Sequence, residues 1–152
     1  MDIFENINER LIFDEGEICA GGGKDIEKII RISPVTLPKD YIEFLKQISG
    51  EGSYGPEFKL KDKGVSIWIW SAQMALEKKE EFDEPFNQEF NSKAWMFGSD
   101  LGDLVYFFGE GKDGFGLYRT EDSLDFERAD KISDTLTDFL VKGIGIDIAT
   151  TL

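Results

Sequence analysis

The sequence predicts an α+β fold, in which a central twisted, mainly antiparallel sheet carries N-terminal helices, one inserted helix and a C-terminal helix. The order of the periodic segments is the first reason. Helical spacing comes first, strand-like alternation follows with one helical interruption, and a helical segment closes the chain. Composition is the second reason, since 41% of the 152 residues are hydrophobic and 13 are Phe. Because neither a linker nor a repeat divides the chain, residues 1–152 are expected to form one domain.

The N-terminal third predicts three helices. Residues 6–18 are expected to hold a short one. A second begins at about Asp25 and ends before Pro34, and its apolar face comprises Ile26, Ile29 and Ile30. The clearest helix has Pro38 in its first turn and ends at Gly50, and its apolar stripe comprises Tyr41, Phe44, Leu45 and Ile48.

The remainder of the chain predicts the sheet and two further helices. The expected strands are residues 57–61, 65–70, 93–99, 103–109, 114–120 and 124–129. After the second strand, Ser71 is expected to cap a helix over residues 71–82, and a loop follows over residues 83–92. The last helix is expected to have Ser133 as its N-cap, to end at Gly143, and to bury Leu136, Phe139 and Leu140.

Net charge is the strongest compositional signal. Seventeen Lys and Arg against 31 Asp and Glu give −14 and a pI of about 4.4. Such a protein repels free nucleic acid and anionic membranes and attracts a basic partner, but many cytoplasmic proteins are acidic only for solubility. Two acidic clusters, residues 77–89 and 121–138, are either solvated faces or mimics of nucleic-acid phosphate.

The location of the protein is predicted from what the sequence lacks. Its start has no basic region followed by an apolar region, so no signal peptide is expected. No apolar run approaches transmembrane length. The single Cys19 cannot form an internal disulfide. These observations favour the cytoplasm.

Enzyme chemistry is not expected, because the sequence contains no histidine. That removes the commonest general base and zinc ligand, and we expect no catalytic residue, no metal site and no cofactor. In "AGGGKD", Lys24 is followed by Asp25, where a phosphate loop requires Ser or Thr. "GEGKDG", residues 109–114, matches a dinucleotide pattern but runs into a strand, so Asp113-Gly114 predicts a hairpin.

Two close aspartates, Asp100 and Asp103, lie within "WMFGSDLGDLVYFF", between two predicted strands. Carboxylates at this spacing suit a metal or an acid–base pair, but no third ligand is evident. Gly98 and Gly102 instead favour a turn in which an aspartate bonds its own backbone. The alternative is that both aspartates line a sheet end where a partner docks.

Two tryptophans alternate with apolar residues in the strand over residues 65–70. Trp68 and Trp70 are expected on one face, and the other face comprises Val65, Ile67 and Ile69. Burial in the core is the default, and a tryptophan beside a binding cleft is the alternative. The candidate partner-contact residues are therefore the aromatic and acidic residues near this cleft and the sheet end: Glu51, Glu57, Trp68, Trp70, Asp100 and Asp103.

Three motifs occur in order between about residues 25 and 142. The first is "LPKDYIEFLKQISGEG", with Leu-Pro, Tyr41, Phe-Leu and a helix end at Ser49-Gly50. The second is "FGSDLGDLVYFF", with Gly-Asp before an aromatic strand, and the third is Phe139-Leu140 in the closing helix. In these motifs the chain resembles the SUKH superfamily of Smi/Knr-like proteins, and it is similar to the YobK-like members. It departs from them in having Ser-Gly for Asn-Gly and a long linker over residues 82–92.

The resemblance implies an α+β fold without catalysis. Most bacterial members are immunity proteins that neutralise secreted polymorphic toxins, and YobK-like members pair with toxins that carry an LXG domain. The function expected is therefore binding of a cognate basic toxin or nuclease domain, most simply an RNase, by blocking its active site. The alternative is a non-enzymatic regulatory or scaffold protein of the Smi/Knr type. The family motif residues appear here as structural residues, so no binding residue is carried over from the family.

Overall fold

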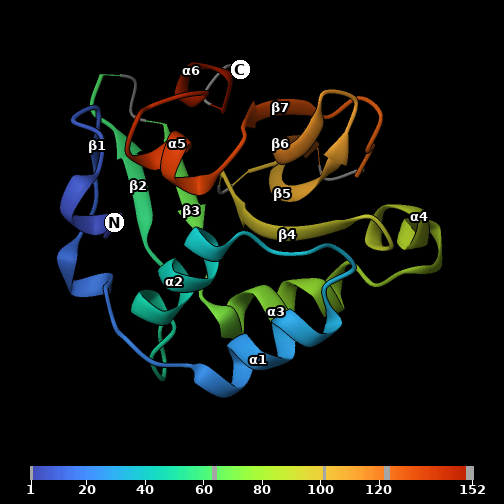
Figure 1. The fold of residues 1–152 in the computed structure, drawn as a ribbon, viewed down its shortest axis with the longest axis horizontal. Coiled ribbons are helices and arrows are strands. Elements are labelled where there is room, and N and C mark those ends of the chain that lie inside the picture. Colours follow the sequence, from blue (N-terminus) through green and yellow to red (C-terminus); the bar gives the residue numbers. More distant parts are fainter. Residues whose placement is uncertain (1, 63–64, 101, 122–123, 150–152) are drawn as a thin grey trace.

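The computed structural model describes residues 2–62, 65–100, 102–121 and 124–149. Over these residues the chain forms a seven-stranded antiparallel sheet in which each strand pairs with its neighbour in sequence. The strands are β1 (Leu11–Ile12), β2 (Glu57–Leu60), β3 (Ser66–Ile69), β4 (Ala94–Ser99), β5 (Leu104–Gly111), β6 (Gly114–Glu121) and β7 (Asp130–Ser133). The predicted α+β fold is confirmed, and the sheet is curled (Figure 1).

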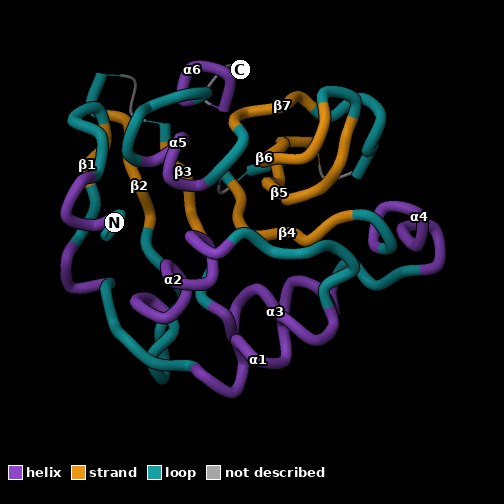
Figure 2. The backbone as a smooth tube through the Cα atoms, viewed as in Figure 1, coloured by secondary structure: helices purple, strands orange, loops and turns teal. Residues whose placement is uncertain are grey.

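Six α-helices surround the described sheet: α1 (Gly23–Ile32), α2 (Lys39–Ile48), α3 (Ala72–Glu81), α4 (Gln88–Asn91), α5 (Leu136–Leu140) and α6 (Ile146–Ala149). Figure 2 separates them from the strands by colour, and shows α1, α2 and α3 grouped on one side of the molecule. Along the longest axis, α4 lies at the opposite end of the molecule from β1 (Figure 1). Within the described part of the chain, no helix has the length and apolar character needed to cross a membrane.

The main core lies between α2 and one face of the sheet. The predicted stripe of α2 is confirmed, because Tyr41, Phe44, Leu45 and Ile48 are all buried. The ring of Tyr41 lies 4.8 Å from that of Phe108 on β5, and the ring of Phe44 lies 6.3 Å from that of Phe58 on β2. Each such side chain stabilises the fold by roughly 1.5–3 kcal/mol through burial.

A hydrogen-bonded carboxylate joins α2 to α5. Asp40, in the first turn of α2, accepts hydrogen bonds at Oδ2 from the backbone N–H and the hydroxyl of Thr137, both at 2.8 Å. Thr137 lies in the first turn of α5, whose free N–H groups favour a negative charge. The C-terminal helix is therefore fixed onto the core by a helix 97 residues earlier in the chain.

Strand register divides the sheet residues between two faces, because directly opposite residues project to the same side. Glu57, Trp68 and Ser99 form one row across β2, β3 and β4. Ile69 and Gly98 form the next row, which reaches Tyr106 on β5 and faces the other way. The core lies against this second face, where Ile69 and Tyr106 are completely buried.

The helix predicted over residues 6–18 is wrong. This segment contains β1, and two 3-10 turns, Phe4–Asn6 and Glu15–Glu17, precede and follow it. The Asn8 side chain accepts the N–H of Arg10, and the Asp14 side chain accepts the N–H of Gly16. Such local side-chain bonds offer the backbone an alternative to helix, and they outweigh the weak helical signal here.

Two predictions in the C-terminal half also require correction. Residues 83–92, predicted as a loop, contain a 3-10 helix (Pro85–Asn87) and α4, and Phe90 anchors them in the core. Residues 124–129, predicted as a strand, are described as turns, and the strand comes later as β7. There the carboxylate of Asp125 accepts the N–H of Arg128, which holds a turn instead of an extended chain.

The remaining helix and hairpin predictions are mostly confirmed. On α1, Ile26 and Ile29 are buried as predicted, but Ile30 is exposed, so its place on the apolar face was wrong. α3 begins where expected, with Ser71 Oγ accepting the N–H of Met74. The N-cap of α5, however, is Thr135 and not Ser133, because Ser133 still belongs to β7. The predicted hairpin joins β5 to β6 through a two-residue turn. α6 lies beyond the last predicted helix and was not anticipated.

Candidate partner-binding surface

Trp68 is the central aromatic residue of the candidate surface, and it projects to the other side of the sheet from Ile69 while it packs against the edge of the hydrophobic core. It is half-buried, and its Nε1–H donates a hydrogen bond of 3.1 Å to the carbonyl oxygen of Tyr54. The ammonium of Lys78, on α3, lies 5.9 Å from the centroid of the indole ring. These two contacts hold the ring in one orientation while part of its surface remains accessible, which suits a binding anchor.

Glu57 lies directly opposite Trp68 in the antiparallel pairing of β2 with β3. Opposed residues project to the same face, so the half-buried Glu57 side chain stands beside the indole ring. The structure therefore brings together two of the residues that the sequence singled out, one acidic and one aromatic. The sequence did not predict that these two residues lie side by side, because their pairing depends on the register of the two strands.

The loop between α2 and β2 adds Glu51 and Tyr54 to this surface. Both are exposed, and Tyr54 has 67% of its surface accessible. The loop borders an open hollow of about 310 Å³ lined by Gly16, Cys19 and residues 51–55. Its path is fixed by the hydroxyl of Ser71, which donates to the carbonyl oxygen of Ser53 at 2.7 Å. Sequence analysis missed Tyr54, although an aromatic residue between glycines was a visible signal.

Trp70 lies in the core and only 1% of it is exposed, so a partner cannot reach its side chain. The reason is that β3 ends at Ile69, so the strand alternation no longer applies one residue later. The two indole rings still contact each other, 6.1 Å apart and nearly perpendicular. The buried ring of Trp70 thus packs against the ring of Trp68, and of the two only Trp68 contributes to the surface.

Asp100 forms the turn between β4 and β5. Its Oδ1 accepts the N–H of Gly102 at 2.8 Å and the N–H of Leu104 at 3.1 Å. The predicted turn is therefore confirmed. Asp103 is exposed just beyond Gly102.

The charge of Asp100 also affects a buried tyrosine of β5. Burial raises the pKa of Tyr106, and the negative charge of Asp100 raises it further. Tyr106 pairs with Gly98, in the row that faces away from the Trp68 row. Asp100 and Asp103 belong to the turn that follows Ser99, and Ser99 lies opposite Trp68 in the pairing of β3 with β4.

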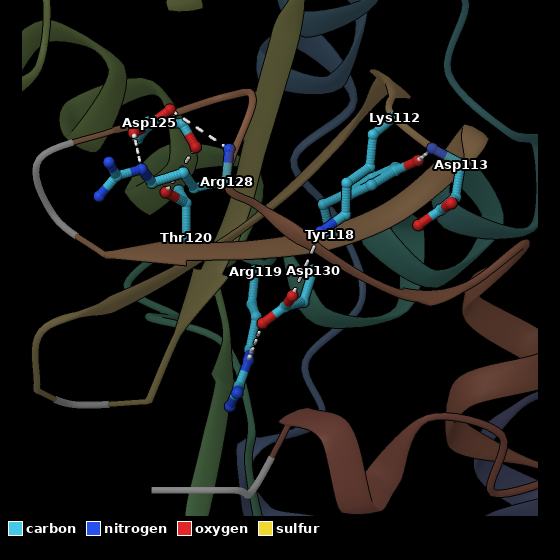
Figure 3. Close-up of polar contacts among 8 residues, drawn as sticks. All are labelled: Lys112, Asp113, Tyr118, Arg119, Thr120, Asp125, Arg128 and Asp130. Atoms are coloured by element: carbon cyan, nitrogen blue, oxygen red, sulfur yellow. Dashed lines mark hydrogen bonds and ion pairs between the residues drawn. The ribbon is translucent and has the colours of Figure 1, made fainter.

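A second polar group, unpredicted from the sequence, lies on β6, β7 and the turns beside them (Figure 3). Asp130 is approached by the ammonium of Lys112 at 3.6 Å and by the guanidinium of Arg119 at 3.7 Å. Asp125 pairs with Arg128 at 3.4 Å. The hydroxyl of Tyr118 accepts the N–H of Asp113 at 3.0 Å and secures the hairpin. Cations therefore neutralise both carboxylates, as expected of structural ion pairs.

No cluster of three or more His, Cys, Asp or Glu side chains that could hold a metal ion occurs among the residues that the structure describes. The surface built from Glu51, Tyr54, Glu57 and Trp68 combines carboxylates with aromatic rings. Such a combination recognises a cationic partner by charge and by apolar contact.

Comparison with protein families identifies this fold. The family model of the SMI1/KNR4 family, also called SUKH-1, matches residues 23–142. The chain belongs to this family. A comparison with curated proteins gave no match. Membership of SUKH-1 is consistent with an immunity protein and with binding of a toxin partner.

The SUKH-1 match begins with α1 and ends just after α5, so β1 and α6 lie outside it. The aromatic residues and the Phe-Leu pairs of the first and third motifs are buried in this structure, whereas Gly102 and Asp103 of the second motif are exposed. Tyr41, Phe44 and Leu45 fill the α2 core, and Phe139-Leu140 form the inner face of α5. These buried motif residues therefore serve the fold.

Proposed function

We propose that this SUKH-1 protein is an immunity protein, which binds a cognate nuclease toxin of the LXG type and blocks its active site. Within this proposal the toxin is an RNase, the chain is close to the YobK-like members, and the complex forms in the cytoplasm. The single observation that carries the proposal is the family match over residues 23–142. The folded unit is proposed to comprise the whole chain.

The charge of the protein supports a basic partner. A nuclease domain is attracted to phosphate and is commonly basic, so a net charge of −14 draws it towards the inhibitor. Opposite charges can raise association rates by about 10- to 1,000-fold. Rapid capture matters for a cell that makes its own toxin, and nuclease–immunity pairs are among the tightest complexes known.

The proposed contact surface has Trp68 as its anchor, with Tyr54 beside it and Glu51 and Glu57 supplying charge. Binding energy concentrates in aromatic residues that partners bury, and acidic neighbours select a basic partner. Asp100 and Asp103 are proposed to extend the negative field at the sheet edge. Direct contact through Trp70 is no longer proposed, because its side chain is buried.

We also propose that the protein has no catalytic activity and needs no metal or cofactor. The absence of histidine from the sequence supports this, as does the use of Asp100 to hold a turn. Purified protein is expected to show no nuclease, esterase or phosphatase turnover with Mg²⁺, Mn²⁺ or Zn²⁺. Turnover that disappears in Asp103→Asn, at unchanged stability, would contradict this proposal.

The immunity role predicts that a toxin gene lies beside the gene for this chain, and it is tested with the toxin domain that this neighbouring gene encodes. Co-expression of the wild-type protein is expected to restore growth of cells that produce the toxin domain, and Trp68→Ala is expected to weaken that rescue. Ile148→Ala, which also truncates a partly exposed apolar residue, is the matched control. A wild-type chain that neither binds the toxin domain nor restores growth would favour the regulatory or scaffold role instead.

A further inference from the structure

A row of adjoining hollows is lined by none of the residues that form the surface around Trp68. It consists of three open hollows of about 400, 710 and 280 Å³. The first and second share Val35 and Thr36 as lining residues, and the second and third share Phe126. We call this feature the long groove. It joins the loop between α1 and α2, the β5–β6 hairpin and the segment that contains α4.

Apolar side chains are exposed along the whole of the long groove. Ile30 lines its first hollow and is 53% exposed, Phe115 lines the second at 38%, and Phe86 lines the third at 84%. Phe86 is the most exposed large apolar residue in the described part of the chain. Leaving such side chains in water is unfavourable, and a row of them beside hollows indicates a contact site.

The backbone around Phe86 is ordered by two buried side chains. Asn87 and Asn91 each donate a side-chain N–H to the carbonyl oxygen of Phe82, at 3.1 and 2.9 Å. Both asparagines are buried, on either side of the single turn of α4. The exposure of Phe86 is thus a consequence of a fixed backbone, and its ring is presented to a partner at little entropic cost.

Charge varies along the long groove. The hollow beside Ile30 has no charged lining residue. Towards Phe86, Glu89 pairs with Lys93 at 3.4 Å and Asp125 pairs with Arg128. Glu110 and Glu127 also line this part, and neither has an ion pair within the residues that the structure describes. The long groove is therefore apolar at one end and acidic at the other.

We propose that the long groove seats an elongated segment of the toxin, separate from the contact at Trp68. This inference rests on the proposed immunity function. The segment places apolar side chains against Ile30, Phe115 and Phe86, and places Lys or Arg against Glu110 and Glu127. A basic partner fits this pattern of charge, whereas a second copy of this acidic chain does not.

The test compares two double variants in binding to the toxin domain encoded beside the gene. Phe86→Ala with Phe115→Ala removes two exposed rings of the long groove. Ile12→Ala with Ile148→Ala removes two exposed apolar side chains outside it and is the matched control. The groove variant is expected to bind at least tenfold more weakly by calorimetry, with an unchanged melting temperature. A groove variant within twofold of the wild type would overturn the inference.

Hydrogen exchange of the wild-type complex gives a second readout that requires no substitution. Amides in residues 33–37, 86–93, 110–115 and 124–127 are expected to exchange more slowly when the toxin domain is bound. Protection confined to residues 51–57 and 66–70 would overturn the groove contact and leave the immunity role intact. If the wild type does not bind the toxin domain at all, both the immunity role and the groove contact fail.

Discussion

Phe44 is the residue on which the core between α2 and the sheet depends most directly. It is 1% exposed, and its ring stacks on that of Phe4 with centroids 4.9 Å apart. Phe44→Ala leaves a cavity, so the free energy of unfolding is expected to fall by about 3–5 kcal/mol. Chemical denaturation measures this, with Phe86→Ala as a control that changes stability by less than about 0.5 kcal/mol. A loss below about 1 kcal/mol for Phe44→Ala would mean that the core has been misassigned.

Residue burial could be predicted where a regular element carried the pattern. Tyr41 and Phe44 were predicted from their spacing on a helix, and both are buried. Trp68 and Trp70 were predicted to be equivalent from their spacing on a strand, but the strand ends between them. The exposed Tyr54 was missed because a loop has no period from which its outward direction could be read.

At the scale of elements, the contact between Asp40 and Thr137 is expected to hold α5 in place. Asp40→Ala leaves the backbone N–H and hydroxyl of Thr137 without their acceptor, and is expected to cost about 1–3 kcal/mol. Glu43→Ala is the matched control on α2, because it removes only an exposed ion pair with Lys46 worth at most about 1 kcal/mol. Equal effects of the two substitutions on the free energy of unfolding would show that Asp40 does not anchor α5.

Elements with strong end signals could be predicted, and those governed by local hydrogen bonds could not. Pro38 and Ser71 mark the starts of α2 and α3, and both helices begin there. The segments over residues 6–18 and 124–129 have mixed patterns, which side-chain bonds from Asn8, Asp14 and Asp125 decide in favour of turns. Periodicity does not report such bonds.

At the scale of the whole molecule, stability is expected to fall at alkaline pH. Burial raises the pKa of Tyr41, and burial with the charge of Asp100 raises that of Tyr106. The folded protein keeps both phenol protons above pH 10, where the unfolded chain releases them. The stability that the two protonated tyrosines give to the folded state is thus fully present below about pH 10, and it decreases as the pH rises above that value. Circular dichroism and phenolate absorbance are expected to change together, and ionisation of every tyrosine in a natively folded protein would contradict this.

The net charge is expected to control the rate of toxin binding. Glu80 and Glu84 are exposed and lie outside the hollows of the long groove. Replacing both by Lys is expected to slow association several-fold at low salt and to leave dissociation nearly unchanged. Stopped-flow mixing with the toxin domain, at low and high salt, measures both rates. An unchanged association rate at low salt would mean that the net charge serves only the solubility of the protein.

Charge was evident in the sequence, but its arrangement over the surface was not. The acidic clusters were predicted as regions of the chain, without their relation to exposed apolar residues. The long groove requires the loop at Val35-Thr36 to meet Phe115 and Phe126, about 80–90 positions later. No periodic pattern predicts contacts between segments so distant, because they depend on how the finished layers pack.

The order of the strands bears on how the protein forms on the ribosome. Each strand from β2 to β7 pairs with the strand that precedes it in the chain. The growing sheet can therefore add each strand at its open edge as that strand is synthesised, without inserting one between two others. The last part of the chain returns to the early part of the molecule, where Thr137 contacts Asp40 and Asp147 of α6 pairs with Arg10. The sheet can thus be almost fully assembled when translation ends, and under the proposed immunity function protection would not wait for a slow rearrangement of the strands.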